Sequence, residues 1–576
     1  MNNIFVEFLP PWVETGIQPA FYDKESGTVL QQTARMYARV NMLIRMFNKL
    51  SKETKETVEE YITKFNDLHD YVHDYFDNLD VQEEINNKLD QMVTDGTLGE
   101  IIEPYITAFE AEIREQVSTI GDVNDLETVN KNTVVAGVNC ANENYSGLWR
   151  TKYGNGFNPV DIYQNIDFFK DNIVIYKDEN NNNYSYYCDL EKHKNIGDTL
   201  IVDPNTDTPT SEQNGSAEHP YSTIGRAYNN ASDGDTISLT SGVYNRNQTG
   251  QFAWTKSLNL IAKDGEPNKV FLGAHDNLSW SQNATYSNVY ETTRSNIALV
   301  IDIRNRNKDE FALLTQVENL ETCASTLYSF AKSGSTVYVN LGEAVTNDKI
   351  AVTLQITSQF RISNSGSNVN VYMENITFLG GDEGFVSVTE SGSYDCKFVA
   401  KNCNFYYSRS NSDALSIAGS DTILENCKAC FGGKDGFNYG AVGTIPTRAI
   451  EINCLGSNNG LRRQTGTENG STSHAYCKVL RYGGVYFNNF GANVCDVGTD
   501  NMSINIECTS FDSVASAGSV KSDFNAQQAN TTMYIYNCHC KGSKSSYNLQ
   551  SATGCTLEVY NTPYDTKGGN GTINIY

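Results

Sequence analysis

The sequence predicts a mainly β protein, a right-handed parallel β-helix that follows an N-terminal α-helical coiled-coil stalk. A short strand motif recurs about every 27 residues in the C-terminal two thirds, as the coils of a β-helix require. Apolar side chains spaced four and three residues apart between Val58 and Leu79 predict the stalk. The composition agrees, because 44 Gly and 34 Tyr against only 11 Pro in 576 residues suit short strands joined by many turns.

The stalk is predicted over residues 51–120. Its seam consists of Val58, Ile62, Phe65, His69, Val72, Phe76 and Leu79. His69 occupies a core position, where a polar side chain commonly fixes register and oligomer number. A second helical run follows, and Asp95-Gly96 interrupts it. The alternative is a single amphipathic helix that packs on a globular neighbour, but the even seam favours self-association.

Two further segments flank the stalk. Residues 1–50 contain too many Pro, Gly and aromatic residues for a stalk, and we predict a docking head there. Residues 121–198 carry short strand-like runs separated by the polar tract DENNNNYSYYCD, which predicts a small β or linker region.

The repeated motif places a small side chain after Asn at the end of an apolar strand. The small position is held by Ile376, Cys403, Cys427, Cys454, Cys508, Cys538 and Thr562, with Cys477 between Cys454 and Cys508. Three β-like runs in each period predict stacked coils over residues 353–576. The Asn side chains are expected to hydrogen-bond along the stack and to tolerate a left-handed backbone. A β-sandwich is the alternative, but its strands would not keep one residue type in register.

The entrance to the β-helix is predicted over residues 199–274. The segment from His219 to Tyr244 gives an amphipathic capping helix, an Asp-Gly turn, a strand and a Gly-Val-Tyr turn. Residues 275–352 break the period with longer alternating runs, which predicts an inserted small β domain.

The charge and the cysteine content limit the classes of function that fit this sequence. The chain has 43 Lys and Arg against 69 Asp and Glu, a net charge of -26, which argues against a general nucleic-acid binder. No signal peptide and no membrane span is expected, so we expect the protein to be made in a cytosol with reduced, buried cysteines. Cys427 and Cys430 form a C-x-x-C pair, but no second pair or nearby His supports a zinc site, and no metal or cofactor is predicted.

Three features resemble bacteriophage tail spikes and neck appendages that contain a pectin-lyase-like β-helix. These are the head and stalk (FLPPWVETG, VQEEINNKLDQMVTDGTLGEII), the entry motif HPYSTIGRAYNNASDGDTISLTSGVY and the Asn-Cys coils. The resemblance covers residues 1–115 and 200–570. It implies a homotrimer, made in the host cytoplasm and fixed to the virion by residues 1–50 through tail, collar or portal-proximal proteins. It also implies binding of a host surface glycan or wall teichoic acid, often with cleavage of that polymer.

Candidate catalytic residues lie where the second strand of each coil begins. Asp413, Asp435, Asn459 and Asp496 are predicted to form one column. Coils lie about 4.8 Å apart, so Asp413 and Asp435 would be roughly 5 Å apart and Asp435 and Asp496 roughly 10 Å. Such carboxyl pairs serve glycosidases, and like charges raise one pKa. The alternative is structural, because Asp and Asn are ordinary turn residues.

His474 completes the predicted catalytic set with Asp413, Asp435 and Asp496, because it could act as a base or bind a phosphodiester oxygen. Similar β-helix proteins carry DGFNY and NGST-x-H blocks, with a His after the Tyr, whereas this sequence has Gly440 there. The predicted polymer contacts are Asn438, Tyr439, Asn459, Arg462, Arg463, Thr472 and Tyr486. The two tyrosines would be stacking platforms for sugars, with lumen filling as the alternative.

Two functions fit these patterns. One is a virion-borne depolymerase that cleaves a host surface polymer by hydrolysis or elimination, favoured by the acidic column and His474. The other is a receptor-binding adhesin with the same fold and no turnover, favoured by the small number of catalytic candidates.

Overall fold

The computed structural model describes residues 157–576, except 160–162, 164, 179–183, 251, 264, 266–267, 356–357, 365, 383, 390–394, 410 and 515–521. The described residues belong to the compact unit Gly156–Tyr576, while Met1–Asn155 forms a second unit. The predicted head (1–50), the predicted stalk (51–120) and the first part of the predicted 121–198 region therefore lie outside the described residues.

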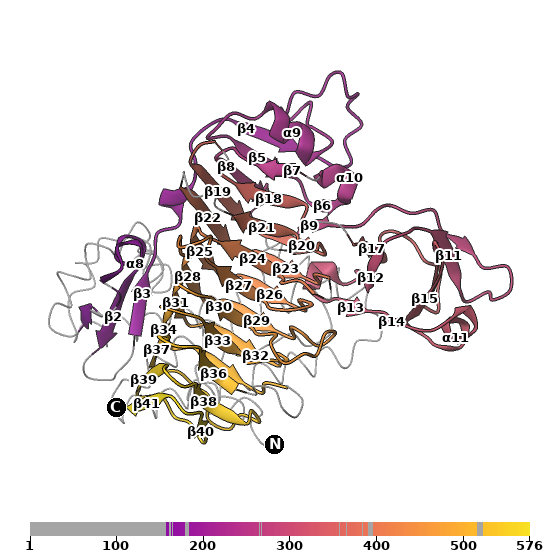
Figure 1. Ribbon diagram of the computed structural model, residues 1–576. Helices are drawn as coiled ribbons and strands as arrows, with labels where there is room; N and C mark the ends of the chain where they lie inside the picture. The colour runs from indigo at the N-terminus through magenta and orange to yellow at the C-terminus, as the bar shows by residue number, and fades with distance from the viewer. Residues whose placement is uncertain are drawn as a thin grey trace, which may run out of the picture. The chain divides into compact units, whose positions relative to one another are not determined.

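The main body is a parallel β-helix built from three sheets (Figure 1). Each regular coil contributes one strand to each sheet, as β19, β20 and β21 do before β22 begins the next coil. Their pairings with β22, β23 and β24 are all parallel. The predicted mainly β, parallel β-helical fold is thus confirmed.

The strands of the three sheets follow in chain order. The 12-stranded first sheet contains β4 (Thr199–Val202), β5 (Thr236–Leu239), β8 (Leu258–Ala262), β19 (Val369–Glu374), β22 (Cys396–Lys401), β25 (Asp421–Glu425), β28 (Arg448–Ile452), β31 (Lys478–Tyr482), β34 (Met502–Ile506), β37 (Thr532–Tyr536), β39 (Thr556–Tyr560) and β41 (Thr572–Ile575). The 8-stranded second sheet contains β6 (Gly242–Tyr244), β9 (Val270–Gly273), β20 (Ile376–Leu379), β23 (Asn404–Tyr406), β26 (Lys428–Cys430), β29 (Leu455–Ser457), β32 (Val485–Phe487) and β35 (Thr509–Phe511). The 10-stranded third sheet contains β7 (Phe252–Trp254), β18 (Phe360–Ser363), β21 (Val386–Thr389), β24 (Leu415–Ala418), β27 (Phe437–Gly440), β30 (Ser471–Ser473), β33 (Val494–Val497), β36 (Ser522–Gln527), β38 (Tyr547–Ser551) and β40 (Lys567–Gly568).

The asparagine stack predicted from the repeat is confirmed from Asn375 to Asn426 at the corner between the first and second sheets. Gly483 and Glu507 take this corner in two later coils. The placement of Cys477 in the repeat is wrong, because Cys454 aligns with Gly484 and Cys477 lies just before β31. Asn375, Asn402, Asn426 and Asn453 all adopt positive φ, between 52° and 63°. The Asn402 amide donates to Asn375 Oδ1 at 2.9 Å, and the Asn426 amide donates to Asn402 Oδ1 at 3.2 Å. The small residue that follows each Asn lies in the lumen, where Cys403, for example, is fully buried.

Both faces of the first sheet are covered over most of its length, which explains its long apolar runs. Its outer face carries a column of side chains that pack against residues 163–190, including Phe168 and Phe169. The members of this column are Tyr372, Val399, Ile423, Ile450, Leu480 and Ile504. The covering segment contains β1 (Phe157–Pro159), α8 (Asp167–Asn172), β2 (Val174–Asp178), β3 (Tyr184–Tyr187) and the 3-10 helix η3 (Glu191–His193).

A short helix, α9 (Ile224–Asn230), packs on the first coil beside β4 and β5 (Figure 1). Thr223 caps it by accepting the Arg226 N–H, and Ile224 and Ala227 are fully buried against the core. The predicted Gly-Val-Tyr turn is wrong in detail, because Gly242–Tyr244 forms strand β6, which pairs with β9. A further short helix, α10 (Arg246–Thr249), follows.

Between β9 and β18 the chain leaves the coils and builds two small sheets (Figure 1). One contains β10 (Ser281–Gln282), β11 (Tyr290–Thr293), β16 (Thr336–Asn340), β15 (Ser329–Ser333) and β14 (Thr315–Gln316). The other contains β13 (Ala312–Leu313), β12 (Ile297–Asp302) and β17 (Ile350–Leu354), and the helices here are η4 (Arg306–Lys308) and α11 (Leu320–Ser325). Asp309 joins this segment to the β-helix by an ion pair with Lys428 and a hydrogen bond from Tyr406.

Every cysteine in the described part of the chain is free, and all of them except Cys188 are buried, as predicted from their positions in apolar strands. None of the helices among the described residues is long and apolar enough to cross a membrane.

Candidate functional site

The site begins at the turns that lead from the second sheet into the third. Leu415 pairs with Phe437 and Phe437 pairs with Ser471, so the residues two positions before each strand stack. These are Asp413, Asp435 and Asn469. The turn before β27 is tight, since a Cβ at Gly436 would lie 2.4 Å from the Gly470 carbonyl oxygen. Neighbouring coils therefore hold Asp435 closely between Asp413 and Asn469.

This register corrects the predicted column of four. Asp413 and Asp435 do stack, but Asn459 lies at the start of the turn, two residues after β29, where its amide donates to Ala429 O at 3.1 Å and Asn489 Oδ1 at 2.9 Å. Asp496 lies within β33, paired with Ser473, and its side chain points into the lumen. Ser471 pairs with Val494, so the column position in this coil is Ala492 and Asp496 lies four residues beyond it, because the register cannot be counted from sequence spacing across coils of unequal length.

A lysine bridges the two stacked carboxyl groups. Lys434 Nζ lies 3.6 Å from Asp413 Oδ1 and 3.8 Å from Asp435 Oδ2. The Asp435 N–H donates to Asp413 Oδ1 at 3.2 Å, and the Asn438 amide donates to Asp413 Oδ2. We call Asp413, Lys434, Asp435, Asn438 and His474 the turn cluster.

Asp435 is the most perturbed acid of the turn cluster. It is 1% exposed and accepts the Asn469 N–H at 2.7 Å. Burial raises its pKa to about 7, and the charge of Asp413 adds to the rise, while Lys434 and the Asn469 N–H oppose it. A carboxyl group with a pKa near 7 holds a proton part of the time at neutral pH and can transfer it.

Burial would lower the pKa of Lys434, but the carboxyl groups of Asp435 and Asp413 outweigh it, so the pKa is raised. His474 follows β30, and burial lowers its pKa, with a further decrease from Lys434 that Asp413 and Asp496 partly offset. The imidazole is thus neutral at pH 7, the form that accepts a proton. The turn cluster combines a protonatable acid, a neutral base and a cation within two neighbouring coils.

The other predicted polymer contacts fall into two groups, the first at the edge of the turn cluster. Asn438 pairs in register with Thr472 on the outer face of the third sheet. Arg463 Nε lies 3.5 Å from Glu468 Oε1, and the Arg463 charge acts on Lys434. Arg462 has a structural role, because its Nη2 donates to the carbonyls of Ser408 and Phe431 at 2.6 and 2.7 Å.

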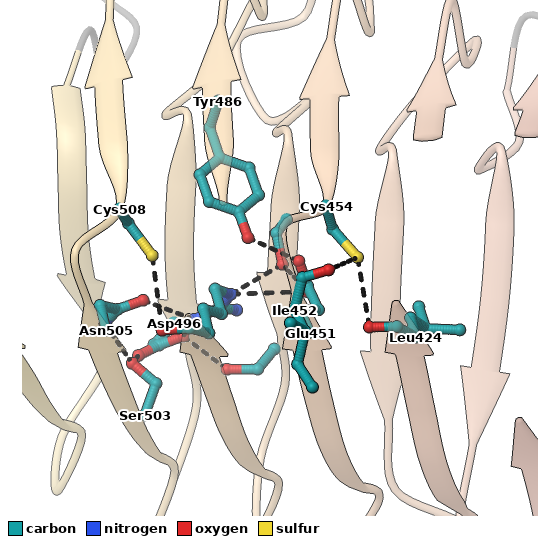
Figure 2. Close-up of polar contacts among 12 residues, drawn as sticks. Leu424, Glu451, Ile452, Cys454, Tyr486, Asp496, Ser503, Asn505 and Cys508 are labelled. Carbon is teal, nitrogen blue, oxygen red and sulfur yellow. Dashed lines mark hydrogen bonds and ion pairs between the residues drawn. The ribbon is translucent and has the colours of Figure 1, made fainter. Parts of the chain in front are cut away.

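The second group lies inside the β-helix, where a polymer cannot reach. Tyr439 and Tyr486 are fully buried, so the surface stacking platforms predicted from sequence are wrong and the lumen-filling alternative holds. Tyr486 donates its hydroxyl to Glu451 Oε2 at 2.6 Å (Figure 2). Asp496 accepts hydrogen bonds from Ser473 and Ser503, which places it in the same interior network (Figure 2).

The interior network contains three charged side chains that are fully buried. Arg481 Nε lies 3.6 Å from Glu451 Oε1, and Arg481 Nη1 lies 3.4 Å from Asp496 Oδ1. Burial disfavours the charged guanidinium, but the charges of Asp496 and Glu451 outweigh it and raise the Arg481 pKa. Asp496 is thus engaged in an internal ion network rather than at the turn cluster.

One member of the turn cluster, Lys434, its neighbour Asn469 and the interior network were not predicted from the sequence. Lys434 precedes Asp435 in the block KDGFN, and Asn469 opens NGSTSH, so their place beside a predicted acid was the available signal. The signal for the network was a charged residue inside an apolar run, as in RAIEI and KVLRY. Among the described residues, no group of three or more His, Cys, Asp or Glu side chains could hold a metal ion.

No protein-family model matches the chain, and no curated protein matches it. Several solved structures are similar in fold. The complex of XylC with xylose is 11% identical, with a TM-score of 0.42, over 66% of this chain and 70% of that chain. A glycoside hydrolase is 8% identical, with a TM-score of 0.39, over 66% of this chain and 95% of that chain. ORF18 of Geobacillus virus E2 is 9% identical, with a TM-score of 0.22, over 70% of this chain and 68% of that chain. At these values, the similarities carry no information about the reaction of this chain.

Proposed function

We propose that this protein binds a carbohydrate polymer of a host cell surface, either wall teichoic acid or a surface polysaccharide, and cleaves it at the turn cluster. The observation that carries the proposal is the opposite perturbation of two groups that belong to neighbouring coils, one before β27 and one after β30. Asp435 has a raised pKa of about 7, and His474 has a lowered pKa. Groups whose pKa values are pushed in opposite directions in this way are suited to act as acid and base at the same pH.

Each member of the turn cluster has a role in the proposed cleavage. Asp435 donates a proton to the leaving oxygen, and neutral His474 accepts one from water or from the sugar. Asp413 keeps the Asp435 pKa high, while Lys434 and Asn438 orient the polymer through its oxygen atoms. Hydrolysis and elimination both require one group that donates a proton to the leaving oxygen and one group that accepts a proton.

The proposed setting is a bacteriophage virion. The supporting observation is the resemblance of the head, stalk and entry motifs to those of tail spikes and neck appendages. In this setting the protein is a homotrimer, attached through residues 1–50 to tail, collar or portal-proximal proteins, and it meets the host polymer during adsorption.

A receptor-binding adhesin without turnover is the second candidate. The observation that favours it is burial: Asp435 is 1% exposed and Asp413 is 8% exposed, whereas the Lys434 side chain beside them is 29% exposed. In this case Lys434, Asn438 and His474 contact the polymer, and the two carboxyl groups only hold the turn together.

The distinguishing experiment measures soluble saccharide or glycerol phosphate released from intact host envelopes. We expect release by the wild-type protein and a loss of at least about 100-fold in Asp435→Asn and in His474→Gln, since removal of a general acid or base typically costs 10²–10⁴-fold. Asp500→Asn, at an exposed turn with positive φ, is the matched control and should release polymer at the wild-type rate. Envelope binding with no release by any of the four proteins would establish the adhesin.

A further inference from the structure

A pocket of about 450 Å³, which contains no residue of the turn cluster, lies between the covering segment and the outer face of the first sheet. One wall comes from α8 and η3, with Phe168, Asp171 and His193. The other comes from residues at the beginning of three successive strands of the first sheet, Lys397, Asp421 and Arg448. A volume of this size is typical of small-molecule sites.

The strand wall is a column of charged residues in register. Lys397 of β22 pairs with Asp421 of β25, which pairs with Arg448 of β28. Arg448 binds both carboxyl oxygens of Asp421, Nε at 2.6 Å and Nη2 at 2.7 Å. Lys397 has no ion-pair or hydrogen-bond partner for its ammonium group among the described residues, and Asp421 is bound instead by Arg448.

The pocket surrounds this lysine with further groups that favour an anion. Lys192 donates to the Asp171 carbonyl oxygen, so its charge also lies at the pocket. His193 is 5% exposed, and its Nε2 has no hydrogen-bond partner. Burial lowers the His193 pKa to about 3, and Lys397 and Lys192 add to the decrease, so both lysines lie close enough to act on this imidazole. Burial and Lys192 also lower the Lys397 pKa despite the nearby Asp421.

We propose that this pocket binds a small ligand that carries one carboxylate or phosphate group, with Lys397 and Lys192 as the residues that contact the anion. An unpaired, partly buried ammonium group is costly, and an anionic ligand would remove that cost by forming the missing charge-assisted hydrogen bonds. Asp171 at the mouth would accept hydroxyl groups, which suits an acidic sugar. This inference does not rest on the proposed cleavage.

The test is calorimetric titration of the full chain with inorganic phosphate, galacturonate and galactose. We expect saturable binding of at least one of the two anions, and the anion that binds identifies the group recognised. Lys397→Met should weaken that binding at least tenfold, and Lys192→Met is the second variant should Lys397→Met fold poorly by circular dichroism. Lys541→Met, which removes the same charge at an exposed turn, should bind as the wild type does.

Three results would overturn the inference. They are no binding of either anion to the wild type, binding of uncharged galactose as tight as that of galacturonate, and unchanged anion affinity in folded Lys397→Met and Lys192→Met.

Discussion

Asparagine serves two purposes at the corner between the first and second sheets. Most residues with a left-handed backbone lose about 1–2 kcal/mol, whereas Asn tolerates it. The side chain also links successive coils, as the Asn426 amide does by donating to Asn402 Oδ1. One residue type thus satisfies both the backbone geometry and the contact between neighbouring coils.

Asn426 allows the two contributions to be separated, since it is exposed and has a φ of 53°. We expect Asn426→Ala to lower the free energy of unfolding by about 1–2 kcal/mol, because Ala loses both the amide contact and the tolerance of positive φ. Asn426→Gly keeps the backbone freedom and should lose less. Urea unfolding followed by circular dichroism measures both variants. Equal stability of Asn426→Ala and the wild type would contradict the role assigned to this corner.

Individual residues also show how much of the candidate site could be predicted from the sequence. Asp413 and Asp435 were predicted correctly as neighbours because both precede a strand by two residues in coils of regular length. Asn459 and Asp496 were not, because the coil between Asp435 and Asn469 is 34 residues long and the register could not be counted across it. The bridge by Lys434 depends on how a long side chain folds over two coils, which no spacing rule describes.

Among the structural elements, strands β28, β31 and β33 are unusual because they carry charge into the lumen. Leu424 of β25 pairs with Glu451, and Glu451 pairs with Arg481. The side chains that stack at this position of the first sheet therefore change from apolar to charged between one coil and the next. Apolar clusters fill the lumen toward either end of this network, one including Val479 and the other Val494. The ionic section thus fixes which strands neighbour one another, since a slipped register would leave its charges unpaired.

Arg481→Met is expected to lower the free energy of unfolding by about 3–5 kcal/mol, because it leaves the buried carboxyl groups of Glu451 and Asp496 without their cation. The triple variant Arg481→Met, Glu451→Gln, Asp496→Asn removes all three charges at nearly constant volume. It should recover most of the lost stability. Urea unfolding midpoints of the two variants test this, and a single variant no less stable than the wild type would rule out a paired interior network.

At the scale of the whole molecule, the β-helix could be predicted because its repeat is visible in the amino-acid sequence. Most coils place Asn at this corner and a small residue after it, so the period survives in the sequence even where strands differ. The segment between β9 and β18 was visible as a break in that period and was predicted as an inserted small β domain. Its division into two sheets was not predicted, because their mostly antiparallel pairings follow no repeat.

Homotrimer formation is a prediction from the seam between Val58 and Leu79. We expect light scattering to give about three times the chain mass of 63.9 kDa. Replacing Phe65 and Val72 by Glu should reduce that mass, because charge at core positions of a coiled coil opposes association. A wild-type mass of 63.9 kDa would contradict the prediction.

The pH dependence of polymer cleavage tests the central claim, that Asp435 acts as a proton donor whose pKa is set by burial and by Asp413. Asp435 has a raised pKa of about 7 and is active when protonated, so cleavage should decline as the pH rises through about 7. His474 has a lowered pKa and is active when neutral, so the acidic limb should lie below 6.5. Asp413→Asn removes the neighbouring charge, lowers the Asp435 pKa and should move the alkaline limb to lower pH. An alkaline limb that stays in place in Asp413→Asn, or that is absent from the wild type, would contradict the assignment of Asp435 as the acid.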